Sequence, residues 1–277
     1  MAEAMMPLLQ TAPETLRLTA FLSGFALLAL CEAAWPRRPL TVPKSRRWFA
    51  NLTIIALNSL VVRLAFPLAP FGLAAMAQTN GWGLFNQLGI SGWQELLASL
   101  LLLDLLIYFQ HRLFHRTPLF WRFHRMHHTD LDLDVSSGIR FHPAEIALSL
   151  LIKMAAVLLL GVAPLSVLLF EILLNATAMF SHANMRLPLA IDRWLRLLVV
   201  TPDMHRVHHS VIPRETDSNF GFNLPWWDRL FGTYRAQPRE GHDLMTIGLK
   251  EFRELDKLGL RQLLLLPFIS RPARKPQ

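Results

Sequence analysis

The sequence has a single cysteine, Cys31, among its 277 residues. One thiol cannot build a disulfide framework, and it cannot supply the thiolate ligands of an iron–sulfur cluster. Charged residues are also scarce, at 17%, whereas 52% of the residues are hydrophobic and the mean hydropathy is +0.31. This composition is too apolar for an ordinary soluble domain of this length. We therefore expect an integral membrane protein in which any metal is bound by nitrogen and oxygen.

The net charge of +8 could indicate a nucleic-acid partner. The basic residues, however, flank hydrophobic segments and do not gather in a separate polar domain. This distribution favours contact with anionic lipid, and no nucleic-acid partner is expected.

Long apolar runs predict the membrane-spanning helices. They lie at about residues 16–35, 50–76 and 93–110, and two more fit between residues 144 and 181. A run of about twenty residues is long enough to cross a bilayer. Arg63, Pro67 and Pro70 predict that the second run is either kinked or a span followed by a short re-entrant or interfacial piece. The expected fold is an all-α integral membrane protein with four to five transmembrane helices and a helical cap.

The loops predict the orientation of these spans. The segment before the first run has no positively charged region typical of a signal peptide, so that run is expected to stay as an uncleaved span. Five Lys or Arg residues lie between Arg37 and Arg47, whereas residues 78–92 contain none. By the positive-inside rule the first of these loops, and everything from His111 onward, faces the cytoplasm. We expect a multi-pass protein of a bacterial inner membrane, with the basic segment from Arg271 to Lys275 also on the cytoplasmic side.

The chain is predicted to form one membrane-embedded domain, residues 1–277. Within it we expect N-terminal spans in residues 1–103, a histidine-rich region in residues 104–234 with a helical hairpin at 144–181, and a basic tail with an interfacial helix in residues 235–277. Residues 187–200 and 258–268 are short apolar or amphipathic pieces. They fit interfacial helices that seat the cap on the membrane, and they fit core helices of the cap equally well.

Histidine is the residue that stands out against this background. Ten of the eleven histidines lie between His111 and His209. Eight of them form three clusters: His111 and His115; His124, His127 and His128; His205, His208 and His209. The HxxxH and HxxHH spacings put the imidazoles of each cluster on one helix face. Converging imidazoles are typical of metal sites, and eight exceed the four to six or so ligands of one ion, so two metals are predicted.

The remaining histidines have weaker patterns. His182 shares a helix face with Glu171 and Asn175, which predicts a ninth ligand at His182. His142 precedes a helix start, where it fits a capping or ligand-supporting role as well as metal ligation. His242 is distant from every cluster, and we expect it to be in solvent.

Three further side chains are candidates for supporting the imidazoles. Asp104 and Tyr108 share one helix stripe with His111. Inside a span, Asp104 needs a partner, either a ligand imidazole or a polar group on a neighbouring helix. Asp203 either orients the last cluster or caps its helix. No catalytic residue is predicted beyond the metal ligands.

Taken together, the motifs resemble a known family. HRLFH, HRMHH and HRVHH, with D-x-x-x-Y before the first box, RFHP, SHAN and the closing N-F-G…W-D-R-L-F-G-T-Y, are similar to the fatty acid hydroxylase and sterol desaturase superfamily between Asp104 and Tyr234. The resemblance implies a membrane-bound non-haem di-iron oxygenase that hydroxylates or desaturates an unactivated C–H bond of a lipid. The ligands that it implies are His111, His115, His124, His127, His128, His182, His205, His208 and His209.

The resemblance also implies partners. Dioxygen chemistry of this kind needs two electrons, and the chain has no ferredoxin cysteines, so we expect an external donor such as a cytochrome b5-like protein or a ferredoxin with its reductase. Imidazole sites bind Zn(II) more tightly than Fe(II), so purified samples could contain zinc. A divalent-metal transporter and a non-catalytic, metal-stabilised membrane protein remain alternatives. The lipid itself is not indicated by any local pattern.

Overall fold

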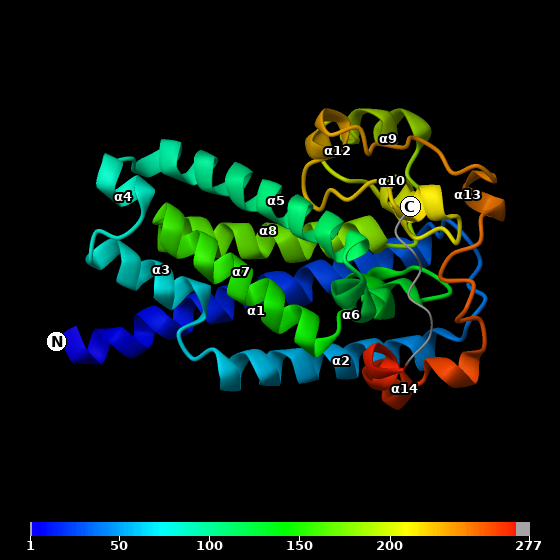
Figure 1. The fold of residues 1–277 in the computed structure, drawn as a ribbon, viewed down its shortest axis with the longest axis horizontal. Helices are drawn as coiled ribbons and strands as arrows, with labels where there is room; N and C mark the ends of the chain where they lie inside the picture. The colour runs from blue at the N-terminus through cyan, green and yellow to red at the C-terminus, as the bar shows by residue number, and fades with distance from the viewer. Residues whose placement is uncertain (1, 270–277) are drawn as a thin grey trace.

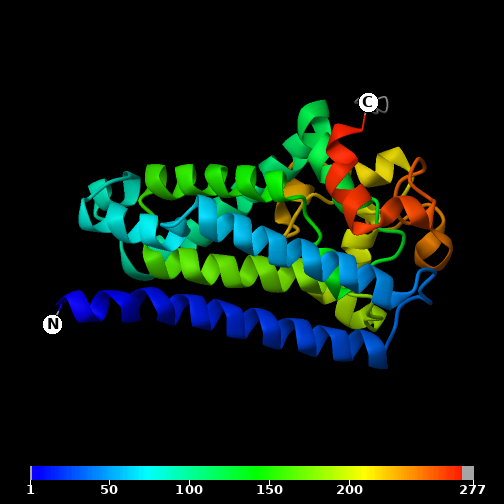
Figure 2. The same ribbon diagram turned by 90° about the horizontal axis from the view of Figure 1, so that it is seen from below.

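Long helices lying side by side form most of the molecule (Figures 1 and 2). The computed structural model describes residues 2–269, with the backbone alone for residues 2–12, 69 and 257. The long helices are α1 (Ala2–Ala34), α2 (Lys44–Ala65), α5 (Gly92–Arg116), α7 (Pro143–Leu160) and α8 (Pro164–His182). Two short helices, α3 (Ala69–Thr79) and α4 (Leu84–Leu88), connect α2 to α5. Residues 2–269 form isolated bridges but no β-strand, so the predicted all-α fold is confirmed.

The predicted number of spans is confirmed at its upper value. In the described part of the chain, five helical segments are long and apolar enough to cross a membrane. They are Pro13–Ala34, Lys44–Leu88, Gly92–Arg116, Pro143–Leu160 and Pro164–His182. Leucines on the outside of α1, among them Leu18, Leu22 and Leu30, are more than half exposed, as expected of side chains that face lipid.

The second span is interrupted where its prolines predict. α2 ends at Ala65, and α3 begins at Ala69 with Pro70 in its first turn. Pro67 has no N–H to continue the hydrogen-bond ladder, so α2 ends just before it, and Pro70 is accommodated in the first turn of α3, where its missing N–H is not needed. The prediction of a span followed by a second short piece is confirmed.

A tight hairpin joins α7 and α8. Gly161 ends α7 in the left-handed conformation (φ 71°), and Pro164 occupies the first turn of α8. A Cβ on Gly83, in the segment before α4, would lie 2.2 Å from the Gly161 nitrogen. The two backbones therefore touch, and only glycine permits that approach.

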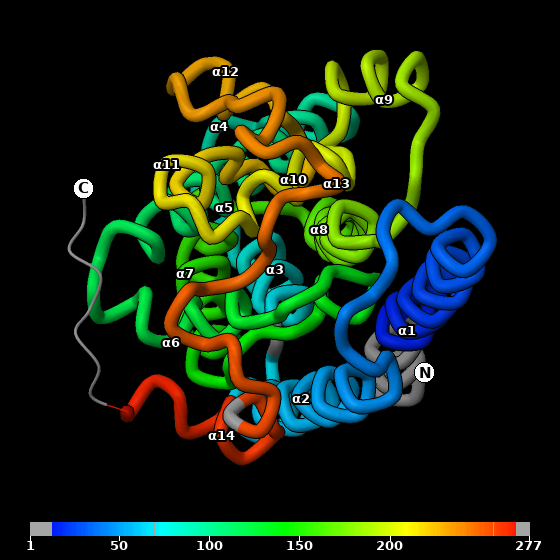
Figure 3. The backbone as a smooth tube through the Cα atoms, turned by 90° about the vertical axis from the view of Figure 1, so that its right-hand side faces the viewer, coloured from blue at the N-terminus to red at the C-terminus, as the bar shows by residue number. Residues whose placement is uncertain are grey.

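The cap lies at the end of the bundle where α5 and α8 finish (Figure 3). Its elements are α6 (Pro118–His128), η1 (Val135–Ile139), α9 (Leu189–Leu195), α10 (Pro202–His208), α11 (Pro213–Thr216), α12 (Trp226–Leu230), α13 (Gly241–Leu244), η2 (Leu255–Leu258), α14 (Leu260–Leu265) and η3 (Leu266–Phe268). These short pieces come from residues 118–139 and 189–268, and they lie together at one end of the spans (Figure 1). The basic segment Arg271–Lys275 lies outside the described residues.

The two short apolar segments of the cap differ in their surroundings. On α9, Leu189 and Trp194 are 81% and 69% exposed, which fits a helix lying on the membrane surface. On the C-terminal segment, Leu263 and Leu266 are buried against Ile54 of α2 and Trp121 of α6. That segment is therefore a core element of the cap.

A buried ionic network fixes the segment between α6 and α7. Arg47 of α2 donates to both carboxylate oxygens of Asp130 at 2.8 and 2.9 Å and to Asp134 at 2.5 Å. It also donates to the carbonyl of Asp132 and to Ser137. Burial raises the pKa of Asp130, but Arg47 and Arg140 outweigh it and hold that pKa below its usual value. One guanidinium thus anchors the chain directly after the second histidine cluster.

Replacing Arg47 by Met should therefore destabilise the protein by about 3–5 kcal/mol, because it removes the cation that contacts both buried carboxylates, Asp130 and Asp134. Arg46→Met is the matched control. Arg46 pairs with an almost fully exposed Asp256, so its loss should cost about 1 kcal/mol or less. Thermal unfolding of both variants in the same detergent measures the difference; equal melting temperatures would contradict the anchoring role.

Candidate metal centre

The first two histidine clusters meet because the chain reverses between α5 and α6. His111 and His115 lie in the last turns of α5. Thr117 is extended and Pro118 starts α6, so the helix cannot continue through this point. α6 then folds back with its second half buried, including His124, His127 and His128.

The other four histidines come from α8 and α10. His182 is the last residue of α8, and α10 carries His205 and His208, with His209 directly after it. The side chain of Thr201 caps α10 by accepting from Met204 N. The alternative that Asp203 caps this helix is therefore wrong.

The nine histidines of the predicted ligand set form two groups. The first contains five imidazoles: His111, His115, His124, His128 and His208. The second contains four: His127, His182, His205 and His209. In each group, one nitrogen per residue lies within 4.8 Å of all the others. The second cluster of the sequence is divided between the groups, because His127 belongs to a different group from His124 and His128.

The nitrogen distances suit ligation of an ion. Nε2 of His111 lies 3.1 Å from Nε2 of His124. In the second group, Nε2 of His182 lies 3.1 Å from that of His127 and 3.2 Å from those of His205 and His209. Two imidazole nitrogens that bind one ion at about 2.1 Å lie roughly 3.4 Å apart in tetrahedral geometry. The observed separations are close to this value.

Hydrogen bonds on the far side of the rings fix which nitrogen carries the proton. Five imidazoles place Nδ1 beside an oxygen: His111 on Phe220 O (2.8 Å), His124 on Glu145 Oε1 (2.6 Å), His127 on Arg140 O (3.3 Å), His182 on Ala178 O (2.7 Å) and His208 on Ser218 O (2.7 Å). A carbonyl can only accept, so Nδ1 donates and Nε2 presents a lone pair. Facing lone pairs repel each other unless a cation lies between them. The donor set therefore fits a metal ion.

Burial supports the neutral form that metal ligation requires. Burial lowers the pKa of His128, His205 and His209 well below the usual value, and the neighbouring imidazoles lower it further. Burial lowers the pKa of His208 to about 3. The Nε2 atom of His208 and both nitrogens of His128 are buried without a hydrogen-bond partner. An ion held by the first group would satisfy Nε2 of His208 and one nitrogen of His128.

Asp104 and Tyr108 support the site indirectly. The partners of Asp104 are the backbone N–H groups of Asn223 and Leu224 and Nε1 of Trp227, at 3.2, 3.1 and 2.8 Å. The expected hydrogen bond from Asp104 to an imidazole is therefore absent, because its carboxylate binds the segment that follows Phe222. Likewise, the hydroxyl of Tyr108 lies 2.9 Å from the hydroxyl of Thr233, and it forms no hydrogen bond with an imidazole.

The other candidate supporting residues have structural partners. Asn175 donates to the carbonyl of Glu171 in its own helix. His142 caps α7, accepting from Ala144 N, and its Nε2 lies 3.2 Å from the carbonyl of Leu264. The capping interpretation of His142 thus fits better than ligation.

Asp203 and His242 belong to a separate ionic cluster. Asp203 pairs with Arg206 and Arg37, so it does not orient an imidazole of the two metal groups. His242 is only 7% exposed and lies 3.8 Å from Asp203. The expectation of a solvated His242 is wrong, and burial lowers its pKa to about 4.

Two supporting residues were missed in the sequence. Glu145 receives the Nδ1–H of His124, and its place in the first turn of a span, two residues after RFHP ends, is the signal that could have indicated it. Asp228, in the closing motif, accepts from the N–H groups of Phe220 and Gly221 at 2.8 Å each. It thereby holds the Phe220 carbonyl in position for His111. The closing motif therefore helps to orient the imidazole of His111.

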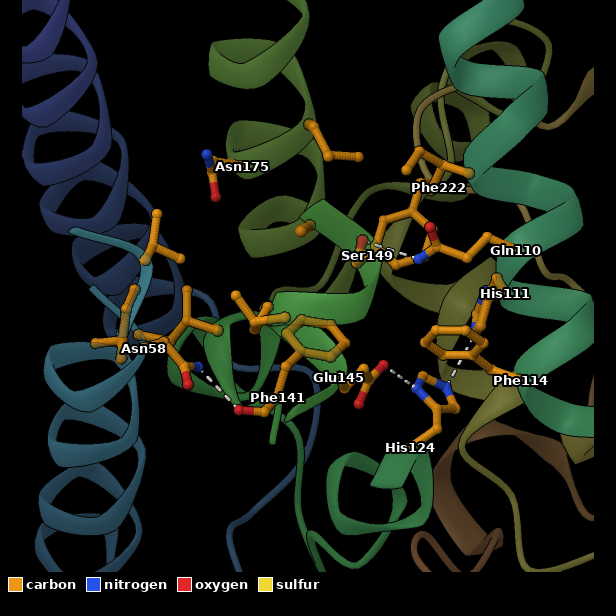
Figure 4. A pocket seen from close by; sticks show the side chains of 18 of the residues that line it. Asn58, Gln110, His111, Phe114, His124, Phe141, Glu145, Ser149, Asn175 and Phe222 are labelled. Atoms are coloured by element: carbon orange, nitrogen blue, oxygen red, sulfur yellow. Dashed lines mark hydrogen bonds and ion pairs between the residues drawn. The ribbon is translucent and has the colours of Figure 1, made fainter. Parts of the chain in front are cut away.

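A cavity of about 270 Å³ runs between the spans and reaches the first histidine group (Figure 4). Most of its wall comes from α2, α5, α7 and α8, with α6 and η1 contributing at one end, and it is largely apolar. His111 and His124 are part of the wall. A ligand from the membrane interior could therefore lie beside these two imidazoles.

The structure combines helices long and apolar enough to span a membrane with two groups of imidazoles that could hold metal ions. Residues 96–233 match the model of the fatty acid hydroxylase family. The chain belongs to this family of lipid-oxidising oxidoreductases within the fatty acid hydroxylase and sterol desaturase superfamily, and the resemblance seen in its motifs is confirmed.

Curated relatives agree with this assignment. The chain is 29% identical to ornithine lipid hydroxylase OlsE of Rhizobium tropici over 79% of its own length and 67% of that protein. It is 30% identical to human alkylglycerol monooxygenase over 57% of its length, and 34% identical to a cholesterol 25-hydroxylase-like protein of Danio rerio over 50%. It spans only 34% of the human enzyme and 55% of the Danio protein. No solved structure matches the chain.

Removing one imidazole should change metal content and leave folding largely intact. His111→Ala deprives the five-member group of a ligand, and His209→Ala leaves three ligands in the other. Loaded with Fe(II) or Zn(II) and desalted, His209→Ala should retain about one ion per chain where the parent retains two, whereas His111→Ala, which keeps four imidazoles, should lose one ion to a chelator faster than the parent does. Elemental analysis measures the metal retained in each case.

His142→Ala is the control for that comparison, because His142 caps a helix outside both groups. It should retain the parental metal content. Unchanged metal content in His209→Ala and an unchanged rate of metal loss in His111→Ala would count against the assigned groups.

Proposed function

We propose that the protein is a membrane-bound non-haem di-iron oxygenase that hydroxylates a C–H bond of a lipid, using dioxygen and two external electrons. The nine histidines of the two groups are its iron ligands, and zinc competes for them during purification. Hydroxylation is preferred to desaturation because the named relatives are hydroxylases and a monooxygenase.

One observation carries this proposal: the wall of the membrane-level cavity includes His111 and His124, which belong to the five-imidazole group. A transporter or a purely structural metal site would not need an apolar chamber beside the ligands. Membership of the fatty acid hydroxylase family also supports an enzymatic role.

The residues have separable roles in this proposal. The imidazoles of the two groups would hold iron, which when bound would supply the chemistry for activating dioxygen and oxidising a C–H bond. Ile107, Phe114 and Phe222 in the cavity wall exclude water and hold the apolar part of the lipid. Glu145 fixes the ring of His124 by accepting its Nδ1–H, which keeps Nε2 aimed at the metal position.

The proposal also includes the orientation of the protein in the membrane and its organisation as one domain. The cap faces the cytoplasm of a bacterial inner membrane, and residues 1–277 act as one unit. A cytoplasmic cap gives soluble electron donors access to the metal side.

The test is anaerobic reconstitution with Fe(II), followed by oxygen. With lipids extracted from the source membrane, the reconstituted protein and a reductant should consume oxygen and yield a lipid heavier by one oxygen atom. Oxygen electrode traces and mass spectrometry measure both. Two bound irons with no oxygen consumption on any lipid extract would refute the oxygenase.

A basic hollow on the cap supports entry of electrons near the first group. It has a volume of about 480 Å³, and Arg116, Arg214, Arg235 and Asp217 surround His115 there. Three guanidinium groups against one carboxylate give a positive surface directly over a proposed ligand. We infer that an acidic one-electron carrier, a ferredoxin or a cytochrome b5-like protein, docks here.

Charge reversal tests this docking site. Arg116→Glu with Arg214→Glu should raise the KM for reduced ferredoxin or cytochrome b5 about tenfold at low ionic strength, and added salt should shrink the difference. Arg193→Glu, the same kind of substitution at an exposed position of α9, should have little effect. If the parent and the Arg116→Glu, Arg214→Glu variant had equal KM values, the electron donor would dock elsewhere.

A further inference from the structure

The cavity wall contains polar atoms that the protein leaves unsatisfied. Glu145 Oε2, Asn58 Oδ1 and Gln110 Oε1 are buried and have no hydrogen-bond partner. All three residues line the cavity, and Figure 4 shows them around it, on α7, α2 and α5. Glu145 and Asn58 are only 5% and 6% exposed.

All three atoms are hydrogen-bond acceptors. The amide of Asn58 is fixed in orientation because its Nδ2 donates to the carbonyl of Phe141 at 2.9 Å, which leaves Oδ1 as the unpaired atom. Glu145 Oε1 is taken by His124, so Oε2 is the free carboxylate oxygen. Gln110 Nε2 contacts Ser149 Oγ at 2.9 Å. The missing groups are therefore donors.

Such atoms are costly to leave unpaired. A buried acceptor without a partner costs about 1–3 kcal/mol, and a charged one costs more. The cavity is large enough for a ligand, and the acceptors are spread over three helices around one space. This arrangement is suited to receiving several donors from one molecule.

We propose that the cavity binds the polar end of the lipid through its hydrogen-bond donors, hydroxyl or ammonium groups, received by Glu145 Oε2, Asn58 Oδ1 and Gln110 Oε1. The substrate class is a neutral or cationic amphiphile with a donor-bearing head. Because Glu145 also holds His124, the carbons next to this head lie beside the first histidine group. The proposal rests on the proposed function for the reaction, but the binding site itself requires no metal.

The charges around the cavity disfavour lipids with an anionic head. A fatty carboxylate or phosphate would approach the Glu145 carboxylate and would be repelled. Arg17 also reaches the cavity, but its guanidinium is paired with Glu171 at 3.0 Å. Glu171 pairs with Lys153 at 2.7 Å as well, so this cation belongs to an ionic cluster of three helices.

The experiment measures lipid binding to metal-free protein in nanodiscs. The probes share one alkyl chain: 1-O-hexadecylglycerol, hexadecylamine, palmitate and hexadecane. The alkylglycerol and the amine should bind at least about tenfold more tightly than palmitate or hexadecane, a difference of about 1.4 kcal/mol. A larger preference for the amine would assign the interaction chiefly to the Glu145 carboxylate, and a larger preference for the glycerol to the amide oxygens.

Asn58→Leu removes one acceptor at similar volume and should reduce the preference for the alkylglycerol several-fold. Ser59→Ala is the control, because the Ser59 hydroxyl lines the same cavity but already donates to the carbonyl of Ile55. Glu145→Gln should reduce the preference for the amine. Normal thermal unfolding shows that each variant is folded.

Equal binding of all four probes, or donor preferences unchanged in both Asn58→Leu and Glu145→Gln, would overturn the proposal and leave water as the partner of these atoms. The result is independent of catalysis. A protein that shows the donor preference but consumes no oxygen would refute the oxygenase while retaining the site.

Discussion

The outward hydrogen bonds of the imidazoles are the interaction on which the site depends. When Nδ1 donates to a fixed oxygen, Nε2 is left with a lone pair that points inward. His111 and His182 do this toward backbone carbonyls, and His124 does it toward Glu145. The inward nitrogens then lie 3.1–3.2 Å apart, a spacing that is unfavourable without a cation. The metal site is thus prepared by its surroundings.

Much of the remaining structure holds those oxygens in place. Asp228 fixes the Phe220 carbonyl, and Asp104 fixes the following segment through Asn223, Leu224 and Trp227. On the opposite side, Arg47 anchors the chain that leads to the Arg140 carbonyl, the partner of His127. Buried charges here are matched with partners, as a low-dielectric region requires. The oxygens that orient the imidazoles are therefore held in place largely by polar contacts.

The geometry also connects chemistry with the membrane. α5 crosses the apolar layer and delivers His111 at its end, and α7 supplies Glu145 at the same level. The cavity between these helices reaches the first histidine group from the apolar side, while the basic hollow reaches His115 from the cap. Lipid and electrons would thus approach one centre from opposite directions. This separation explains why the cap rests directly on the spans.

The sequence alone determined the membrane class, a count of four to five spans, an irregularity near Pro67 and Pro70, and the family, because hydropathy and helical spacing are local properties of the chain. It also identified all nine histidines of the two groups. Only the tertiary structure decided how they divide, since the separation of His127 from His124 and His128 depends on the rotation of α6 against α8 and α10. The partners of Asp104, His142 and His242 were likewise set by segments distant in sequence, which no local pattern encodes.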